Sequence, residues 1–222
     1  MHINKIFVEE MTSRLKAQMT IKPRFRFNLK TQDALNLLAT FYSIAVNSRH
    51  CEMKMDKNTE DNLISIAKYI TQEVPKIGLM LCGTCGNGKT TMVYALKKTI
   101  DYLEKFNHFS FMGEYFEGML SFVDVRYILQ LVRDEEKYNS LRQRCLLAID
   151  DMGKEPVEVM IYGTVSNPVI DLMEYRYQHQ LFTVVTTNLT PQEIKEKYGK
   201  RVADRFREMM EVIVFQDISY RG

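Results

Sequence analysis

The chain has 222 residues, of which 45% are hydrophobic and 26% are charged. This length and composition exclude a disordered or collagen-like chain and predict one full domain with a short extension. Thirty Lys and Arg residues against 28 Asp and Glu give a net charge of +2, so any basic surface must be local. No apolar run approaches the roughly 18 residues of a membrane span, and acidic residues lie where a signal peptide would be apolar. We therefore expect a cytoplasmic protein that does not contact a membrane.

Residues 1–30 are predicted to form a short N-terminal extension, with a candidate partner-binding helix near residues 6–18. Residues 31–222 are predicted to form the main domain. The extension is basic, because no acidic residue follows Glu10 within it. Its segment Lys22–Phe27 alternates cations with aromatic residues, which is typical of a surface that stacks on single-stranded nucleic acid. An edge strand that covers a ligand pocket fits the same pattern.

The hydrophobic pattern of the main domain predicts two helices and then a series of alternating strands and helices. In the two helices, residues 31–47 and 58–72, apolar side chains recur three and four positions apart. The later alternation is typical of an α/β domain around a mostly parallel sheet. We expect strands at residues 77–82, 120–123, 145–149, 182–186 and 212–215. We expect further helices at residues 90–106, 124–138, from 167 and from 190 to 198.

A glycine-rich loop between the first strand and its helix is the strongest local signal. It reads GTCGNGKT and fits the pattern G-x-x-x-x-G-K-[ST] in the required strand-loop-helix context. Glycines let successive backbone N–H groups face a phosphate chain at the N-terminal end of a helix. Lys89 adds a charge for the β and γ phosphates, and the Thr90 hydroxyl can bind Mg²⁺. The predicted nucleotide-binding residues are Gly83, Thr84, Cys85, Gly86, Asn87, Gly88, Lys89, Thr90 and Thr91.

Two cysteines overlap this loop, at Cys82 and Cys85, and their C-x-x-C spacing is also found in redox and zinc sites. The other cysteines, Cys51 and Cys145, lie far away in the sequence, and no second Cys or His pair at metal-binding spacing lies nearby. Ordinary reduced cysteines are therefore the favoured interpretation.

Polar side chains follow two other predicted strands. Asp150 and Asp151 end the apolar run LLAI, and Asn188 ends VVTT. An acid at the C-terminal end of a buried parallel strand emerges beside the phosphate loop. We expect Asp150 to hold Mg²⁺, Asp151 to polarise the attacking water and Asn188 to sense the γ-phosphate, although Asn188 also suits an ordinary turn. The long stretch between Lys89 and Asp150 leaves room for crossovers that would place their strands side by side.

Two arginines, Arg201 and Arg205, are four positions apart and share one face of a predicted helix. Such a pair usually makes exposed salt bridges. The alternative is an arginine finger, a charge that stabilises the phosphoryl group during transfer.

Four stretches of the chain, taken together, resemble one family. They are GTCGNGKTT, LLAIDDMGKEP, VVTTNLTPQEIKEKYGKRVADRF and a terminal ISYR. Their order is similar to that in the AAA+ ATPases of the DnaC-type helicase-loader group, which also contains the IstB-type transposition helpers. The resemblance covers about residues 23–221. It implies a P-loop NTPase of the AAA+ type that binds ATP and Mg²⁺, with a parallel five-stranded sheet flanked by helices.

The resemblance also implies further roles. Asn188 would be sensor I, and Arg205 would be the finger in a neighbouring subunit's site, which requires a ring or spiral oligomer. Arg221 matches sensor II, and we place Arg201 with it among the nucleotide-binding residues. The predicted helix 124–138 would line a path for single-stranded DNA. The function implied is an ATP-dependent loader of a replicative helicase.

Two departures from the family's pattern have consequences. Few residues follow the last predicted strand, so we expect no C-terminal helical lid, and the adenosine must be held by the segment before the first strand and by a neighbouring subunit. Asp151 stands where many AAA+ enzymes have the longer Glu, so we expect slow turnover.

Two other functions stay open from the residues alone. An IstB-like helper would use the same site on duplex DNA together with a transposase. A nucleotide-dependent adaptor would use its acids only to hold Mg²⁺ and would hydrolyse nothing.

Overall fold

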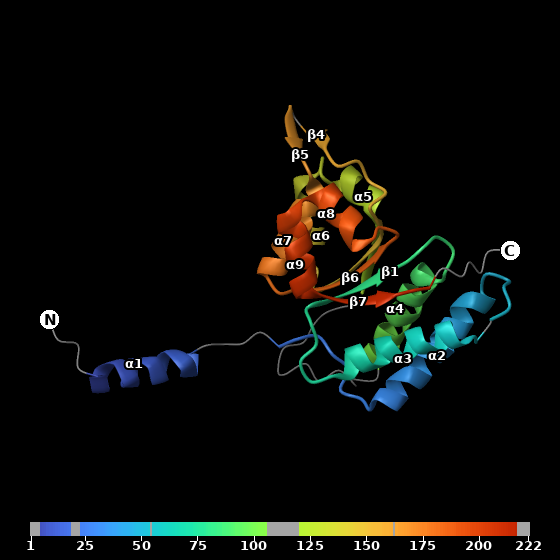
Figure 1. Cartoon of the computed structure of the whole chain (residues 1–222), viewed down its shortest axis with the longest axis horizontal. Coiled ribbons are helices and arrows are strands. Elements are labelled where there is room, and N and C mark those ends of the chain that lie inside the picture. The colour runs from blue at the N-terminus through green and yellow to red at the C-terminus, as the bar shows by residue number, and fades with distance from the viewer. Residues whose placement is uncertain (1–4, 19–22, 54, 106–119, 162, 217–222) are drawn as a thin grey trace.

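Five parallel strands form the central sheet, in the order β2-β3-β6-β1-β7 (Figure 1). The computed structural model describes residues 5–18, 23–53, 55–105, 120–161 and 163–216. The strands of the sheet are β1 (Gly78–Cys82), β2 (Ser121–Asp124), β3 (Leu146–Met152), β6 (Phe182–Thr187) and β7 (Met210–Val214). The α/β class and the five-stranded parallel sheet expected from the sequence are therefore confirmed.

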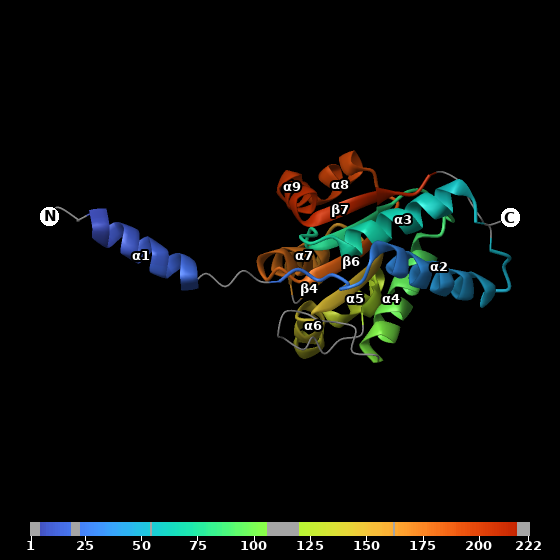
Figure 2. The same ribbon diagram turned by 90° about the horizontal axis from the view of Figure 1, so that it is seen from below.

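Helices cover both faces of this sheet (Figure 2). One face carries α2 (Thr31–Asn47), α3 (Lys57–Thr71) and α4 (Lys89–Lys105). The other face carries α5 (Val125–Leu131), α6 (Glu135–Arg142), α7 (Pro168–Gln178), α8 (Pro191–Tyr198) and α9 (Lys200–Met209). The N-terminal helix α1 (Lys5–Gln18) lies apart from this body in both views (Figures 1 and 2). In the part of the chain that the structure describes, no helix is long and apolar enough to cross a membrane.

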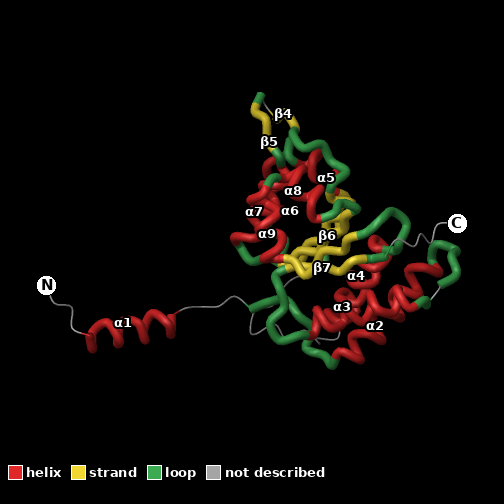
Figure 3. The backbone as a smooth tube through the Cα atoms, in the orientation of Figure 1, coloured by secondary structure: helices red, strands yellow, loops and turns green. Residues whose placement is uncertain are grey.

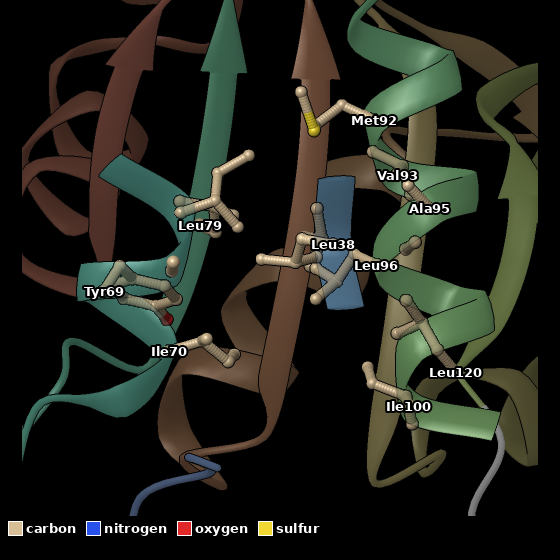
Figure 4. Close-up of a cluster of buried hydrophobic side chains, with 14 of the residues drawn as sticks. Leu38, Tyr69, Ile70, Leu79, Met92, Val93, Ala95, Leu96, Ile100 and Leu120 are labelled. Carbon is tan, nitrogen blue, oxygen red and sulfur yellow. The ribbon is translucent and has the colours of Figure 1, made fainter. Parts of the chain in front are cut away.

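The alternation of side chains along β1 builds two separate cores. Leu79 and Leu81 join the core under α2, α3 and α4, whose side chains interdigitate in Figure 4. Met80 and Cys82 join the core under α5 to α9. Because successive residues of a strand point to opposite faces, a strand buried on both faces must be apolar throughout, as the sequence of β1 is.

The strand order differs from one expectation. The strand that carries Asp150, β3, does not lie beside β1, because β6 pairs with β1 on one edge and with β3 on the other. The polar residues at the ends of β3 and β6 nevertheless reach the edge of the sheet where the loop after β1 lies, since all these strands run in the same direction.

Two local predictions are corrected by the structure. The single helix expected at residues 124–138 is broken, because Asp124 and Asp134 each accept a backbone N–H bond as an N-cap and so begin two short helices, α5 and α6. A small hairpin between β3 and α7, with strands β4 (Val159–Ile161) and β5 (Thr164–Ser166), was not expected (Figure 3).

The prediction that the aromatic residues of the basic segment stack on nucleic acid is also wrong. Phe25 and Phe27 are 5% and 1% exposed, and the Phe25 ring lies 4.3 Å from that of Phe182. Buried rings cannot stack on nucleic-acid bases, and residues 23–30 form no strand. The main body therefore includes these residues, while a separate role for residues 1–30 stays a prediction.

One buried cation links segments on the face of the sheet that α5 to α9 cover. Arg176 is fully buried, and its guanidinium donates to the carbonyls of Arg142 (3.1 Å), Arg144 (2.7 Å) and Phe182 (2.6 Å) and to the Thr183 hydroxyl (2.8 Å). Burial lowers the pKa of Arg176 to about 9, which leaves it charged at neutral pH. The side chain therefore joins the end of α6 to the starts of β3 and β6.

Arg176→Met is expected to lower the free energy of unfolding by about 3 kcal/mol, because the buried bond to the Phe182 carbonyl and the part-buried bonds to the carbonyls of Arg142 and Arg144 are lost, at up to about 1–3 kcal/mol each. Urea denaturation measures the change. The control is Arg207→Met, whose side chain is 81% exposed and which should change stability by less than about 0.5 kcal/mol. Equal losses in the two variants would contradict the role given to Arg176.

Candidate nucleotide-binding site

The loop between β1 and α4 has the backbone that its glycines suggest. Gly83, Gly86 and Gly88 have φ values of 143°, 89° and 89°, which residues with a side chain rarely adopt. At Gly88 a Cβ atom would also lie 2.8 Å from the hydroxyl oxygen of Tyr42. Glycine is therefore required at this position both for its conformation and for the close approach of α2.

The ammonium of Lys89 lies within the curl of this loop. It donates to the carbonyls of Gly83 and Thr84, both at 2.7 Å, and to Oδ1 of Asn87 at 3.0 Å. Burial lowers the pKa of Lys89, since the charged form loses water, although nearby acidic groups oppose this shift. Two carbonyl oxygens and one amide oxygen thus hold the Lys89 ammonium. Oxygen atoms of an anionic ligand could take their place.

Thr90 and Asp150, the two predicted metal-binding residues, are in contact. The Thr90 hydroxyl lies 3.0 and 3.2 Å from the two carboxylate oxygens of Asp150. A third residue, Thr186 of β6, donates its hydroxyl to Asp150 Oδ1 at 2.5 Å. Burial raises the pKa of Asp150, while the hydrogen bonds from Thr186 and Thr90 lower it. Sequence reasoning missed Thr186, although it lies within the run VVTTN that was singled out for Asn188.

Asp151 is held in an unusual backbone conformation. Its φ is 60°, in the left-handed region, at an irregularity in the pairing of β3 with β6 between Ile149 and Met152. Its backbone N–H donates to the Thr186 hydroxyl at 2.9 Å, and its carboxylate pairs with Lys154 at 2.6 Å. This turn gives the second acid a different direction from that of Asp150 at the end of the same strand.

A cavity of about 290 Å³ is lined by Lys89, Thr90 and Asp151 among others. One wall comes from α2 and the residues after it, the segment that the sequence analysis expected to hold the adenosine. There Arg49 donates to the Thr91 hydroxyl at 3.0 Å and lies 5.8 Å from the Tyr94 ring centre. The lining residues are Tyr42, Val46, Arg49, Cys51, Glu52, Cys85, Gly86, Asn87, Gly88, Lys89, Thr90, Thr91, Asp151, Lys154 and Asn188. Asn188 therefore lines the same cavity as Asp151, while its role as a γ-phosphate sensor stays a prediction.

The zinc alternative for the C-x-x-C pair gains no support. Cys82 is buried and Cys85 is exposed, and the two do not form a disulfide. Among the described residues, no group of three or more His, Cys, Asp or Glu could hold a metal ion. The oxygen atoms of Thr90 and Asp150 instead suit a hard cation that keeps several waters, such as Mg²⁺.

Two solved structures share this arrangement of strands and helices. A crystal structure of the DnaC helicase loader aligns with a TM-score of 0.57 and 21% sequence identity, over 78% of this chain and 98% of that chain. The chain has the AAA+ P-loop NTPase fold. A crystal structure of DnaI aligns with a TM-score of 0.52 and 18% identity, over 73% of this chain and 87% of that one. Comparisons with protein-family models and with curated proteins find no match.

Arg201 and Arg205 are not among the residues that line the cavity. Both lie on α9 and pair with Glu174 of α7, directly for Arg205 and at 3.5 Å for Arg201. The Arg205 side chain is 18% exposed and lies over the Tyr177 ring at 5.4 Å. Arg221 lies outside the described residues. The roles predicted for these three arginines stay predictions.

Asp150→Asn is expected to raise the melting temperature of the protein without nucleotide at pH 7.5. Because folding raises the pKa of Asp150, this carboxyl favours the folded state when it is protonated and opposes it when ionised. The gain should shrink as the pH falls toward the ordinary carboxyl pKa of about 3.9. Thermal melts across pH measure it, with the surface variant Asp204→Asn as control. A lower melting temperature at pH 7.5 would mean that hydrogen bonding outweighs burial.

Proposed function

We propose that the protein is a Mg²⁺-dependent ATPase of the helicase-loader type, which hydrolyses ATP at subunit interfaces, contacts single-stranded DNA and remodels a replicative helicase. The observation that carries the proposal is the contact between Thr90 and Asp150. It brings the two expected metal-binding groups together directly beside the lysine loop. The likeness of the fold to the DnaC helicase loader supports the choice of this class of ATPase.

The residues around the cavity fit ATP and Mg²⁺. When bound, these two would supply the phosphoryl group for transfer and neutralise the charge on its oxygens. Lys89 would exchange the carbonyls of Gly83 and Thr84 for phosphate oxygens, an exchange favoured because hydrogen bonds between ionised partners are stronger. Thr90 and Asp150 would hold the metal.

The remaining polar residues of the cavity would act on the attacking water. The Asp151 carboxylate would accept a hydrogen bond from this water and polarise it. Lys154 limits where the carboxylate can point, because it pairs with Asp151 at 2.6 Å. Asn188 lines the same cavity and could orient the water or the γ-phosphate through its amide.

The position of α9 supports hydrolysis between subunits. Arg205 is held by Glu174 and points to α7, and Figures 1 and 2 both draw α9 apart from the start of α4. A guanidinium on this part of the body can complete the site of an adjacent copy more readily than its own. This arrangement supports assembly into a ring or spiral.

Arg205→Ala should keep nucleotide affinity but lower the hydrolysis rate by on the order of 10³, the usual contribution of an arginine finger. Lys89→Ala should weaken ATP binding about tenfold or more, because it removes the charge beside the phosphates. Fluorescent-nucleotide titration and steady-state ATPase assays at rising protein concentration measure these effects.

The matched control is Arg207→Ala on the same helix, whose side chain is 81% exposed. It should leave both binding and hydrolysis unchanged. Equal loss of nucleotide binding in the Arg205 and Lys89 variants would refute the role of Arg205, and a wild-type rate strictly linear in protein concentration would refute assembly.

Single-stranded DNA is expected to stimulate hydrolysis more than a duplex of the same length. The proposed contact is the surface of α5, where the Tyr127 side chain is exposed and offers a ring for base stacking. Tyr127→Ala should remove the stimulation without changing the rate in the absence of DNA. The control is Tyr102→Ala, which removes an exposed ring from α4. Stronger stimulation by duplex DNA would instead favour the transposition-helper alternative.

A further inference from the structure

We propose that Glu155 and Tyr198 are positioning residues that couple the arginine-bearing helix α9 to the turn that carries Asp151. The inference rests on the proposed function, because it concerns how the site of one subunit responds when α9 engages a neighbouring copy. Neither residue lines the cavity described above, so an effect on hydrolysis must act through other residues, and the contacts below lead to Asp151.

The first half of the link is a buried carboxylate. Glu155 is 2% exposed and uses both of its oxygens. Oε2 accepts the backbone N–H of Gly153 at 2.8 Å, and Oε1 accepts the Tyr198 hydroxyl in a short hydrogen bond. Lys197 adds two bonds from its ammonium, to the carbonyls of Gly153 (2.6 Å) and Glu155 (2.5 Å). The segment after Asp151 is thus fastened to the C-terminal end of α8 at several points.

This segment sets the conformation of Asp151. Lys154, in the middle of it, donates its backbone N–H to the Asp151 carbonyl at 3.1 Å and its ammonium to the Asp151 carboxylate. Gly153 has a φ of 108° and touches Leu189, which follows Asn188, so closely that a Cβ atom would lie 2.7 Å from that side chain. A shift of residues 153–155 would therefore move the carboxylate of Asp151.

The second half of the link leads to α9. Tyr198 is the last residue of α8, and only Gly199 separates it from α9. Its ring packs edge-on against Phe206 of α9 at 6.4 Å between ring centres, and Phe206 directly follows Arg205. Burial, with a further contribution from Glu155, raises the pKa of Tyr198, so its hydroxyl stays protonated and donates. A displacement of α9 at a subunit contact would therefore reach Glu155 through the Phe206 ring and the ring and hydroxyl of Tyr198.

Tyr198→Phe removes only the hydroxyl and keeps the packing against Phe206. We expect it to lower kcat about tenfold, as the loss of one positioning hydrogen bond would, and to leave KM and nucleotide affinity within about twofold. In an Arg205→Ala background it should cause no further loss. The control is Tyr69→Phe, since Tyr69 is also buried and donates one hydrogen bond, to the Lys76 carbonyl at 3.0 Å. It should lower the melting temperature similarly but leave kcat unchanged.

A merely structural role predicts a different pattern. Tyr198→Phe would then lower the rate by the same factor with and without Arg205, or Tyr69→Phe would lower kcat equally. Either result overturns the coupling.

A second measurement does not need hydrolysis. Hydrogen exchange of residues 150–158 is followed at low and high protein concentration with a non-hydrolysable ATP analogue. Self-association should slow this exchange in the wild type but not in Tyr198→Phe, and an unchanged wild-type exchange overturns the proposal. If no variant hydrolyses ATP, the proposed function fails while the exchange data still decide the coupling.

Discussion

A hydrogen-bonded junction of three side chains holds the site together. Thr90 lies in the first turn of α4, Asp150 lies near the C-terminal end of β3 and Thr186 near that of β6, and the carboxylate of Asp150 accepts from both hydroxyls. A buried carboxylate is costly unless donors surround it, so the two threonines make its burial tolerable. The junction can form only because β6 lies between β1 and β3, which brings all three segments to one edge of a parallel sheet.

The same site contains two buried ionisable side chains. Lys89 and Asp150 are both buried, and burial shifts the pKa of each toward its neutral form. Carbonyl, amide and hydroxyl groups surround each charge, and under the proposed function a phosphate would pair with the lysine and a cation with the acid. Burial of each charged form therefore opposes folding.

The two faces of the sheet contribute differently to the site. The face under α2, α3 and α4 supplies the lysine loop and a wall of the cavity, and its core is a continuous apolar cluster. The other face has buried side chains that form hydrogen bonds, among them Arg176 and the pair formed by Glu155 and Tyr198. Hydrogen bonds have directional geometry, and in the proposed coupling those of Glu155 and Tyr198 would pass a displacement of α9 to the segment after Asp151.

The sequence by itself determined the features that depend on short-range patterns. The lysine loop from Gly83 to Thr90 and the polar strand ends at Asp150 and Asn188 were found because glycines, apolar runs and caps act within a few residues. It could not determine that β6 separates β1 from β3, that Thr186 and Lys154 bond the two acids, or that Phe25 and Phe27 are buried. Those contacts join residues far apart in the chain, and only the order in which strands pair and helices pack decides which of them meet.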